Sequence, residues 1–287
     1  MAGQLLQSKD SDWDFGRKTL AERISGGEAG LLGIMADPAY LAVYRNAGAS
    51  AFGQAQTMRC PHLLTDGRCG IRDFRSPTCA TWFCKYERGA RGQALWRAIH
   101  DVLLLADRVV SLWCLERMQI DIEKQLAALE ELDPQFSAAR IDHRRDELRD
   151  RDLWADWYGR ETEFYIACAR HAAELDWETL LEIGGHEFAL YARRARKLAT
   201  AHADQRLPES LRTGQFRVTN ADAGLVWLDA YNPYDPLEVS SDVLTFVAAC
   251  DGRDTESIIS GHVAAGGRYP DRILLRTLLD HGVLEPA

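Results

Sequence analysis

Four cysteines lie close together and are the residues best suited to chemistry in this sequence. Cys60, Cys69, Cys79 and Cys84 fall within a span of 25 residues that is punctuated by glycine and proline. Four thiolates can close a tetrahedral zinc site or hold a four-iron cluster. Either group would brace a loop that has too few apolar residues to form a core of its own. We therefore predict that these four cysteines bind a metal.

The spacing of the four thiols favours iron–sulfur over zinc. Structural zinc sites usually have about two to four residues between paired ligands, and only Cys79 and Cys84 come near that spacing. Wide and irregular spacing suits a cuboidal cluster, whose ligands arrive from separated directions. We expect a 4Fe-4S iron–sulfur cluster, with Zn2+ as the alternative. The nearby His62 can replace a thiolate, donate to a sulfur, or be a solvated loop histidine.

Three further cysteines, Cys114, Cys168 and Cys250, are scattered through apolar segments. Free cysteine is commonly buried as a small apolar residue, so we expect these three in the core. The total of seven cysteines is odd, and the first residues show no basic region followed by an apolar run. These features do not suggest a disulfide framework or a signal peptide. We expect a cytoplasmic protein whose thiols stay reduced.

Charge and hydropathy argue against two classes of partner. The net charge is −9 at pH 7, whereas general nucleic-acid binders depend on neutralising phosphates. The most apolar stretch, 102–115, is interrupted by Asp107 and Arg108, and it is shorter than the roughly 18 residues that cross a bilayer. We expect neither a nucleic acid nor a membrane as partner.

The cysteine segment also resembles a known family. It reads Cys60-Pro-His-Leu-Leu-Thr-Asp-Gly-Arg-Cys69-Gly-Ile-Arg-Asp-Phe-Arg-Ser-Pro-Thr-Cys79-Ala-Thr-Trp-Phe-Cys84. This is similar to the second half of the zinc- or iron-chelating cysteine-cluster family, often called YkgJ-like. The positions that match in order are Cys60-Pro61, Leu63, Asp66-Gly67, Cys69, Ile71, Arg75, Pro77, Cys79 and Cys84.

The resemblance has two departures and two implications. The family usually has another cysteine group upstream, whereas residues 1–59 contain no cysteine, and Ser76 separates Arg75 from Pro77 where the family has Arg-Pro. The resemblance therefore implies one chelating centre with at most these four thiolates. Flagellin lysine methylases carry a comparable cysteine group, which implies protein modification as the class of reaction.

The elements that position these residues are expected to be mostly helical. Apolar residues recur near the helical period over three ranges, 94–133, 151–175 and 177–202, with a break or kink at Gly184-Gly185 in the last. We predict a mainly α fold, in which a helical bundle carries a loop-rich, four-cysteine metal-binding insertion and a small C-terminal winged-helix-like α/β module. The predicted segments are an N-terminal helical segment (1–59), the cysteine-cluster loop (60–93), the bundle (94–203) and the module (204–287).

The C-terminal module is predicted from short strand-like runs followed by three short helices. The runs are 216–218 and 224–228, and the helices are 241–250, 255–264 and 271–281, the last ending at Gly282. The pattern is similar to PqqD-like peptide-chaperone and recognition domains, which are attached to peptide-modifying enzymes. Residues 204–287 hold seven basic and thirteen acidic groups, a net charge of −6. We therefore expect a protein or peptide partner at this module, rather than DNA.

Other polar residues at helical spacing have more than one interpretation. Glu161, Cys168 and His171 are seven and three residues apart, so they can be metal ligands or an acid/base pair, or can make a helix-edge salt bridge or a tyrosine hydrogen bond. His186, just after the paired glycines, poses the same choice. The sequence has no Walker loop, no Gly-x-Ser-x-Gly and no His-Glu-x-x-His, so it assigns no catalytic residue.

Three functions remain open at this point. The first is a metal-binding protein, iron–sulfur favoured over zinc, that takes part in a peptide- or protein-modifying system. The alternative is a non-enzymatic metal or redox sensor that signals through its winged-helix module. The third is an iron or zinc carrier, for which a site closed by four thiolates would release its metal poorly.

Overall fold

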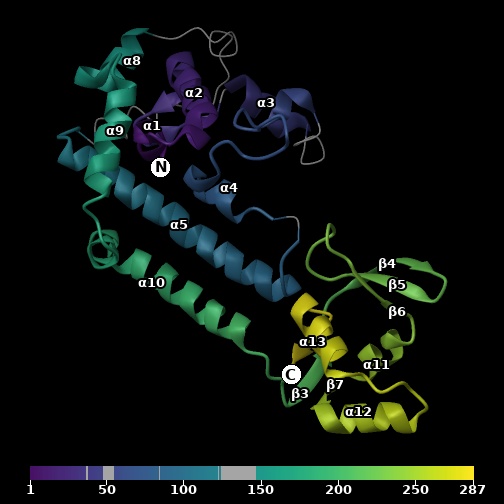
Figure 1. Ribbon diagram of the computed structural model, residues 1–287. Helices are drawn as coiled ribbons and strands as arrows, with labels where there is room; N and C mark the ends of the chain where they lie inside the picture. Colours follow the sequence, from purple (N-terminus) through teal and green to yellow (C-terminus); the bar gives the residue numbers. More distant parts are fainter. Residues whose placement is uncertain (37, 48–54, 84, 122, 124–146) are drawn as a thin grey trace. The chain divides into compact units, whose positions relative to one another are not determined.

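A computed structural model describes residues 1–36, 38–47, 55–83, 85–121, 123 and 147–287 (Figure 1). Cys84, one of the four predicted ligands, lies outside the described residues. The chain divides into two compact units, here called unit 1 (1–80 with 104–186) and unit 2 (81–103 with 187–287). Both units combine stretches that are far apart in the sequence, and the division falls inside two long helices, α5 (Gly89–Arg117) and α10 (Trp177–Ala203).

Unit 1 is built almost entirely from helices. They are α1 (Ala2–Gln7), α2 (Asp14–Arg23), α3 (Pro38–Ala47), most of α4 (Pro77–Thr81), the second half of α5, α8 (Glu147–Trp154), α9 (Glu161–Ala172) and the start of α10. Two short strands, β1 (Ala29–Gly30) and β2 (Gly33–Ile34), pair antiparallel. The core gathers apolar side chains from α1, α2, α5, α8, α9 and the segment 24–31 that follows α2: Leu5, Leu20, Ile24, Leu31, Leu115, Trp154, Phe164 and Tyr165.

A glycine sets the contact between α1 and α9. A Cβ atom placed on Gly3 would lie 1.7 Å from the carbonyl oxygen of Tyr165 and 2.9 Å from the Cβ of Ala169. Only a residue without a side chain allows the two backbones to approach this closely. The hydroxyl of Tyr165 then reaches across the core and donates to the carbonyl oxygen of Gly30 at 2.7 Å.

Two of the three predicted bundle helices differ from the prediction. The single helix predicted over 151–175 is wrong, because the chain forms α8, a 3-10 turn (Ala155–Trp157) and α9, with Gly159 at φ 76° between them. The helix predicted over 94–133 corresponds to α5, which begins earlier, at Gly89, and ends earlier, at Arg117. Just beyond this end, Gln119 takes the left-handed conformation and Ile120 N–H donates to the carbonyl oxygen of Leu115 at 3.0 Å. Residues 124–133 of that prediction lie outside the described part of the chain.

The third bundle helix follows the prediction. Helix α10 spans Trp177–Ala203, and Gly185 interrupts it with φ 63° and ψ −154°. The expected kink at the paired glycines is therefore confirmed.

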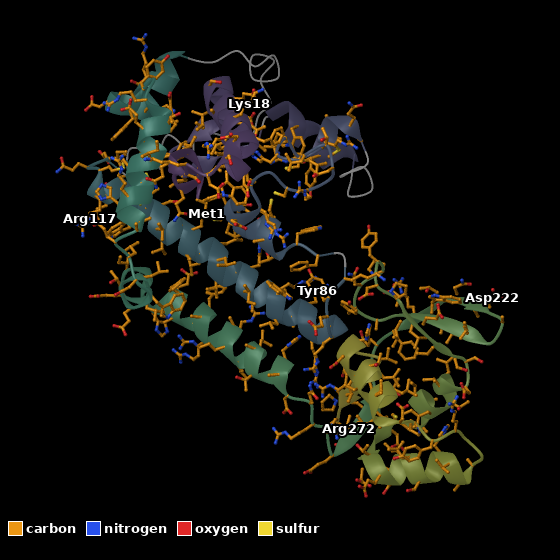
Figure 2. The ribbon with its side chains drawn as sticks, viewed as in Figure 1. Met1, Lys18, Tyr86, Arg117, Asp222 and Arg272 are labelled. Carbon is orange, nitrogen blue, oxygen red and sulfur yellow. The ribbon has the colours of Figure 1, made fainter. Side chains whose placement is uncertain are left out.

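The C-terminal part of unit 2 is an α/β module with two small antiparallel sheets (Figure 2). One sheet has the order β7 (Asp251–Asp254), β3 (Ser210–Thr213), β8 (Leu284–Pro286), and the other has the order β4 (Arg217–Asp222), β5 (Leu225–Asp229), β6 (Leu237–Ser240). Three helices complete it: α11 (Val243–Ala249), α12 (Thr255–Ala264) and α13 (Arg272–His281). The fold class predicted from the sequence, mainly α with a small C-terminal α/β module, is confirmed.

Local sequence signals explain the ends of these helices. The carboxylate of Asp254 accepts from Ser257 N–H at 2.8 Å, and that of Asp271 accepts from Leu274 N–H at 2.7 Å, so each caps its helix. Gly282 ends α13 in the left-handed conformation, at φ 79°. The buried core of the module lies between these helices and the strands: Leu211, Val226, Leu228, Val239, Phe246, Val247, Cys250, Ile258, Leu275, Leu278, Leu279, Val283 and Leu284.

Across the described residues, no helix has both the length and the apolar composition that a membrane span requires.

Candidate metal centre

Cys60 and Cys69 are brought together by a tight hairpin. Leu63 pairs with Cys69 in an antiparallel bridge, and Gly70 N–H donates to the carbonyl of His62 at 2.8 Å. The turn is closed by Leu64 N–H bonding the carbonyl of Arg68 at 2.8 Å, with Gly67 at φ 84°. Asp66 completes it by accepting from Arg68 N–H at 2.9 Å and from its Nε at 2.7 Å. We call residues 60–70 the cysteine hairpin.

Cys79 comes from a separate element. It lies in α4, which begins after Ser76, and the Ser76 carbonyl accepts from Ala80 N–H at 2.9 Å. The Ser76 hydroxyl oxygen is 3.4 Å from Cys79 N–H and accepts from it. Cys60 and Cys79 are exposed and Cys69 is half-buried, so the three described thiols of the predicted set are open to solvent and to ligands.

Helix α2 supports the cysteine hairpin along one face. A Cβ on Gly16 would lie 2.3 Å from the carbonyl oxygen of Gly70, so this glycine admits the hairpin backbone. One turn later, the hydroxyl of Thr19 lies 2.8 Å from Nδ1 of His62 in a buried hydrogen bond. Residues three apart share a helix face, which is why Gly16 and Thr19 meet the same segment.

The pKa of Cys60 depends on the groups that surround its sulfur. Although Cys60 has exposed surface, the protein atoms around its sulfur desolvate the thiolate and raise the pKa. The backbone N–H of His62 opposes this by hydrogen bonding to the sulfur, and the guanidinium of Arg23 also lowers the pKa. Cys69 and Cys79 raise it further through their own negative charge. Cys60 is therefore within electrostatic range of both other thiols.

The three described thiols alone do not form a complete set of metal ligands. Considering only the described ranges, no group of three or more His, Cys, Asp or Glu side chains is placed to hold one metal ion. The donor chemistry nevertheless fits a metal that prefers sulfur, because three thiols from two elements gather in one region and Cys84 follows Cys79 by five positions.

His62 is a structural residue rather than a solvated one. The whole residue is 6% exposed, and its Nδ1 is engaged by Thr19. Burial, with a smaller effect of Arg23, lowers the pKa of His62 to about 4, so the imidazole is neutral at pH 7. The interpretation as a solvated loop histidine is wrong, because the hairpin folds this side chain onto α2. Its backbone N–H, not its ring, is what reaches the sulfur of Cys60.

The other candidate residues of the helices do not gather with the cysteines into a metal site. Glu161 is buried at the start of α9, where its Oε1 accepts from Gly159 N–H at 3.2 Å. His171 makes an edge contact with Trp113, with ring centroids 6.4 Å apart. His186 is exposed beside the kink of α10. Glu161 and His171 thus make local contacts within unit 1, and His186 lies at the surface.

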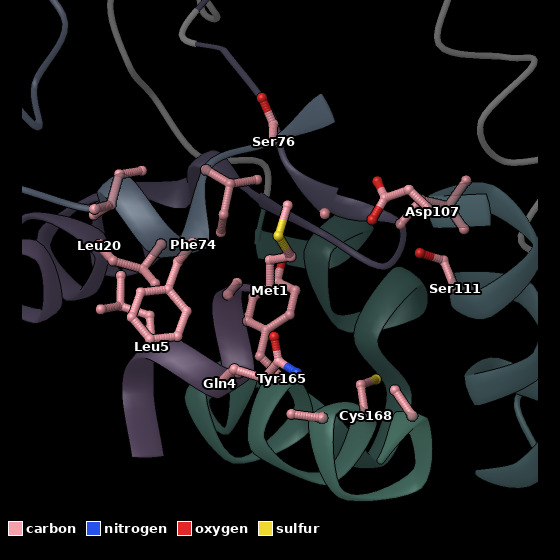
Figure 3. A pocket seen from close by; sticks show the side chains of 18 of the residues that line it. Met1, Gln4, Leu5, Leu20, Phe74, Ser76, Asp107, Ser111, Tyr165 and Cys168 are labelled. Atoms are coloured by element: carbon pink, nitrogen blue, oxygen red, sulfur yellow. The ribbon is translucent and has the colours of Figure 1, made fainter. Parts of the chain in front are cut away.

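A cavity of about 410 Å3 lies in unit 1 beside the cysteine hairpin (Figure 3). Its walls come from α1, α2, α5, α9, the hairpin and the start of α4. Four cysteines contribute to its lining, and these are Cys60, Cys79, Cys114 and Cys168. Helix α5 presents Asp107 and Ser111 to it one turn apart, and α9 presents Tyr165 (Figure 3). Burial raises the pKa of the Asp107 carboxyl, as expected for a carboxylate beside an apolar wall.

This lining is the part of the site that the sequence analysis missed. Cys114 and Cys168 were expected in the core, and Cys114 is buried there, but both also line the cavity. The one available signal was Asp107 within the apolar stretch of α5, because it is four residues before Ser111 and seven before Cys114 on one helix face.

The chain matches no protein-family model, no curated protein and no solved structure.

Proposed function

We propose that this protein binds a metal through the thiolates of Cys60, Cys69, Cys79 and Cys84. An iron–sulfur cluster of the 4Fe-4S type is favoured, and Zn2+ is the alternative. The observation that supports the proposal is the cysteine hairpin, which places Cys60 and Cys69 together and within electrostatic range of Cys79. A bound cluster would supply electron transfer, whereas zinc would supply structure alone.

Two groups near Cys60 favour its anionic form. The backbone N–H of His62 and the guanidinium of Arg23 both lower the pKa of Cys60, although burial raises this pKa overall. Such outer contacts orient metal ligands and tune their basicity. Thr19 keeps the His62 segment in place from α2. These contacts would keep Cys60 in position while the remaining ligands bind.

We place this metal centre in a peptide- or protein-modifying system of the cytoplasm, where thiols stay reduced. The cavity supports this role, because an apolar space of about 410 Å3 with a carboxylate and a hydroxyl on its wall can receive a substrate side chain beside the cysteines. The sensor alternative needs no such cavity.

The C-terminal module is proposed to bind a protein or peptide partner. Tyr269, just before α13, and Ile273, in its first turn, are 66% and 77% exposed, and large exposed apolar residues favour protein contacts. The net charge of −6 over 204–287 opposes binding to DNA. A binding assay with random duplex DNA at low salt should show no association. Salt-sensitive binding at micromolar concentrations would instead support the sensor alternative.

The metal is tested on protein purified without oxygen, by measuring iron, sulfide and zinc per chain together with the visible spectrum. We expect brown protein with about four irons per chain. Cys69→Ser should lose the metal, and Cys250→Ser, which changes a thiol in the core of unit 2, should retain it. Colourless protein with one zinc that depends on Cys69 would support the alternative metal. Wild-type protein with neither metal, or metal unaffected by Cys69→Ser, would overturn the proposed site.

A further inference from the structure

Two cysteines that the proposed metal centre does not use lie close together inside unit 1. Cys114 lies on α5 and Cys168 on α9, and the thiol of Cys114 donates to the backbone carbonyl oxygen of Cys168 at 3.4 Å. The thiol of Cys168 donates to Sδ of Met118 at 3.6 Å, and the two cysteine side chains are close enough to shift each other's pKa. The two thiols are 54 positions apart in sequence, so their proximity is a product of helix packing.

The cavity gives this pair access to small molecules. Cys114 is only 2% exposed and Cys168 is half-buried, so neither thiol lies on the outer surface of the protein. Both cysteines nevertheless line the cavity of about 410 Å3, and Figure 3 shows Cys168 at its wall below Tyr165. A compact reagent that enters the cavity comes up against these two residues, of which Cys168 is the more accessible, whereas a folded protein does not.

The two thiols are chemically unequal. Interaction with the Cys168 side chain lowers the pKa of Cys114, and interaction with Cys114, together with burial, raises the pKa of Cys168. The thiolate is the nucleophile in disulfide exchange, which favours Cys114 as the first of the two to react. Cys250 offers a contrast within the same chain: its Sγ lies 3.4 Å from the carbonyl of Phe246, and burial raises its pKa to about 11.

We propose that Cys114 and Cys168 form a redox-active dithiol that small-molecule disulfides oxidise through the cavity. The Cys114 thiolate attacks one sulfur of the small disulfide, which forms a mixed disulfide and releases one small thiolate. The Cys168 sulfur then attacks the Cys114 sulfur, which closes the protein disulfide and releases the second small thiolate. The two cysteine protons pass to the two small thiolates. The dithiol loses two electrons and the small disulfide gains them. This inference does not depend on the proposed metal.

The test uses the full chain, purified without oxygen and equilibrated with mixtures of bis(2-hydroxyethyl) disulfide and 2-mercaptoethanol. Remaining thiols are blocked with an alkylating reagent, and peptides are identified by mass spectrometry without reduction. As the disulfide fraction rises, we expect loss of free thiol at both Cys114 and Cys168 and the appearance of one peptide pair that joins them. Excess 2-mercaptoethanol should restore both thiols. Cys250 should stay alkylated throughout.

Single variants separate the two roles. Cys168→Ala should accumulate a mixed disulfide at Cys114, whereas Cys114→Ala should leave Cys168 as free thiol. Full alkylation of both residues at every mixture would overturn the proposal. It would also be overturned by disulfides that join either residue to Cys60, Cys69, Cys79 or Cys84 in place of the pair. The wild-type peptide map is decisive even if a variant fails to fold.

Discussion

Arg88 donates two hydrogen bonds to the carboxylate of Asp280, from Nε to Oδ2 at 2.9 Å and from Nη2 to Oδ1 at 3.0 Å. The Asp280 side chain is 8% exposed, and Arg91 and Arg276 approach the same carboxylate at 3.6 and 3.3 Å. Residues just before and within the start of α5 are therefore tied to α13, at the other end of the sequence. This contact is one reason that 81–103 belongs to unit 2.

Replacing the central carboxylate should destabilise unit 2. Asp280→Asn keeps the size of the side chain but leaves the arginines without their shared anion, and breaking a buried ion pair costs about 3–5 kcal/mol. Urea unfolding, with hydrogen exchange of α13 as the local measurement, checks this. Asp251→Asn is the control, because Asp251 pairs with Arg253 on the surface and its loss should leave the unfolding midpoint unchanged. Equal effects of the two variants would contradict the prediction.

Adding one methyl group at Gly3 should separate α1 from α9. The new Cβ would overlap the carbonyl of Tyr165, and overpacking of this kind costs about 1–3 kcal/mol. Gly26→Ala is a matched control, because a Cβ there meets nothing within 4 Å. Thermal unfolding of both variants gives the comparison. A midpoint for Gly3→Ala equal to that of Gly26→Ala would show that the helices move apart without cost.

Removing the hydroxyl of Thr19 should loosen the cysteine hairpin. Thr19→Val leaves the buried Nδ1 of His62 without its partner, and an unsatisfied buried polar group costs about 1–3 kcal/mol. Trypsin cleavage after Arg68, which is exposed in the turn, should become faster. Thr200→Val, on the exposed surface of α10, should leave the rate unchanged. An unchanged rate for Thr19→Val would mean that other contacts hold the hairpin.

The cavity carboxylate should make stability depend on pH. Burial raises the pKa of Asp107 in the folded protein, so the folded state holds its proton to a higher pH than the unfolded state does. Its contribution to stability is present below the unfolded pKa and is lost as pH rises through the folded pKa. Asp107→Asn should therefore gain stability relative to wild type as pH increases over that range. Parallel unfolding curves at several pH values test this, with Asp152→Asn on the exposed surface of α8 as the control. A difference between Asp107→Asn and wild type that stays constant with pH would contradict it.

Features that depend on a local signal could be predicted from the sequence. The kink at Gly185, the end of α13 at Gly282 and the bounds of α12 all depend on residues within one turn of the feature. The break between α8 and α9 was missed although Gly159 is present, because a single glycine is compatible with a helix and the aromatic residues around it continue the apolar pattern. Local propensity does not decide such a case; packing around Trp154 and Phe164 does.

The candidate site was predicted only in part for a similar reason. The cysteine cluster could be identified because its residues are neighbours in sequence, and its fourth member, Cys84, lies outside the described residues. The contacts of Gly16 and Thr19 with the hairpin, and the pairing of Cys114 with Cys168, join residues more than 40 positions apart. They follow from how α2, α5 and α9 pack, which no spacing rule within one segment reveals.

The turn of the cysteine hairpin has a kinetic consequence for the proposed metal. Cys60 and Cys69 are nine positions apart, and the entropy of closing that loop is lost once, when the protein folds, rather than at each encounter with an ion. An ion that binds one thiolate therefore meets the second at high effective concentration. Asp66 and Gly67, which shape the turn, would thereby govern how fast the proposed site captures its first metal ion and how slowly that ion escapes.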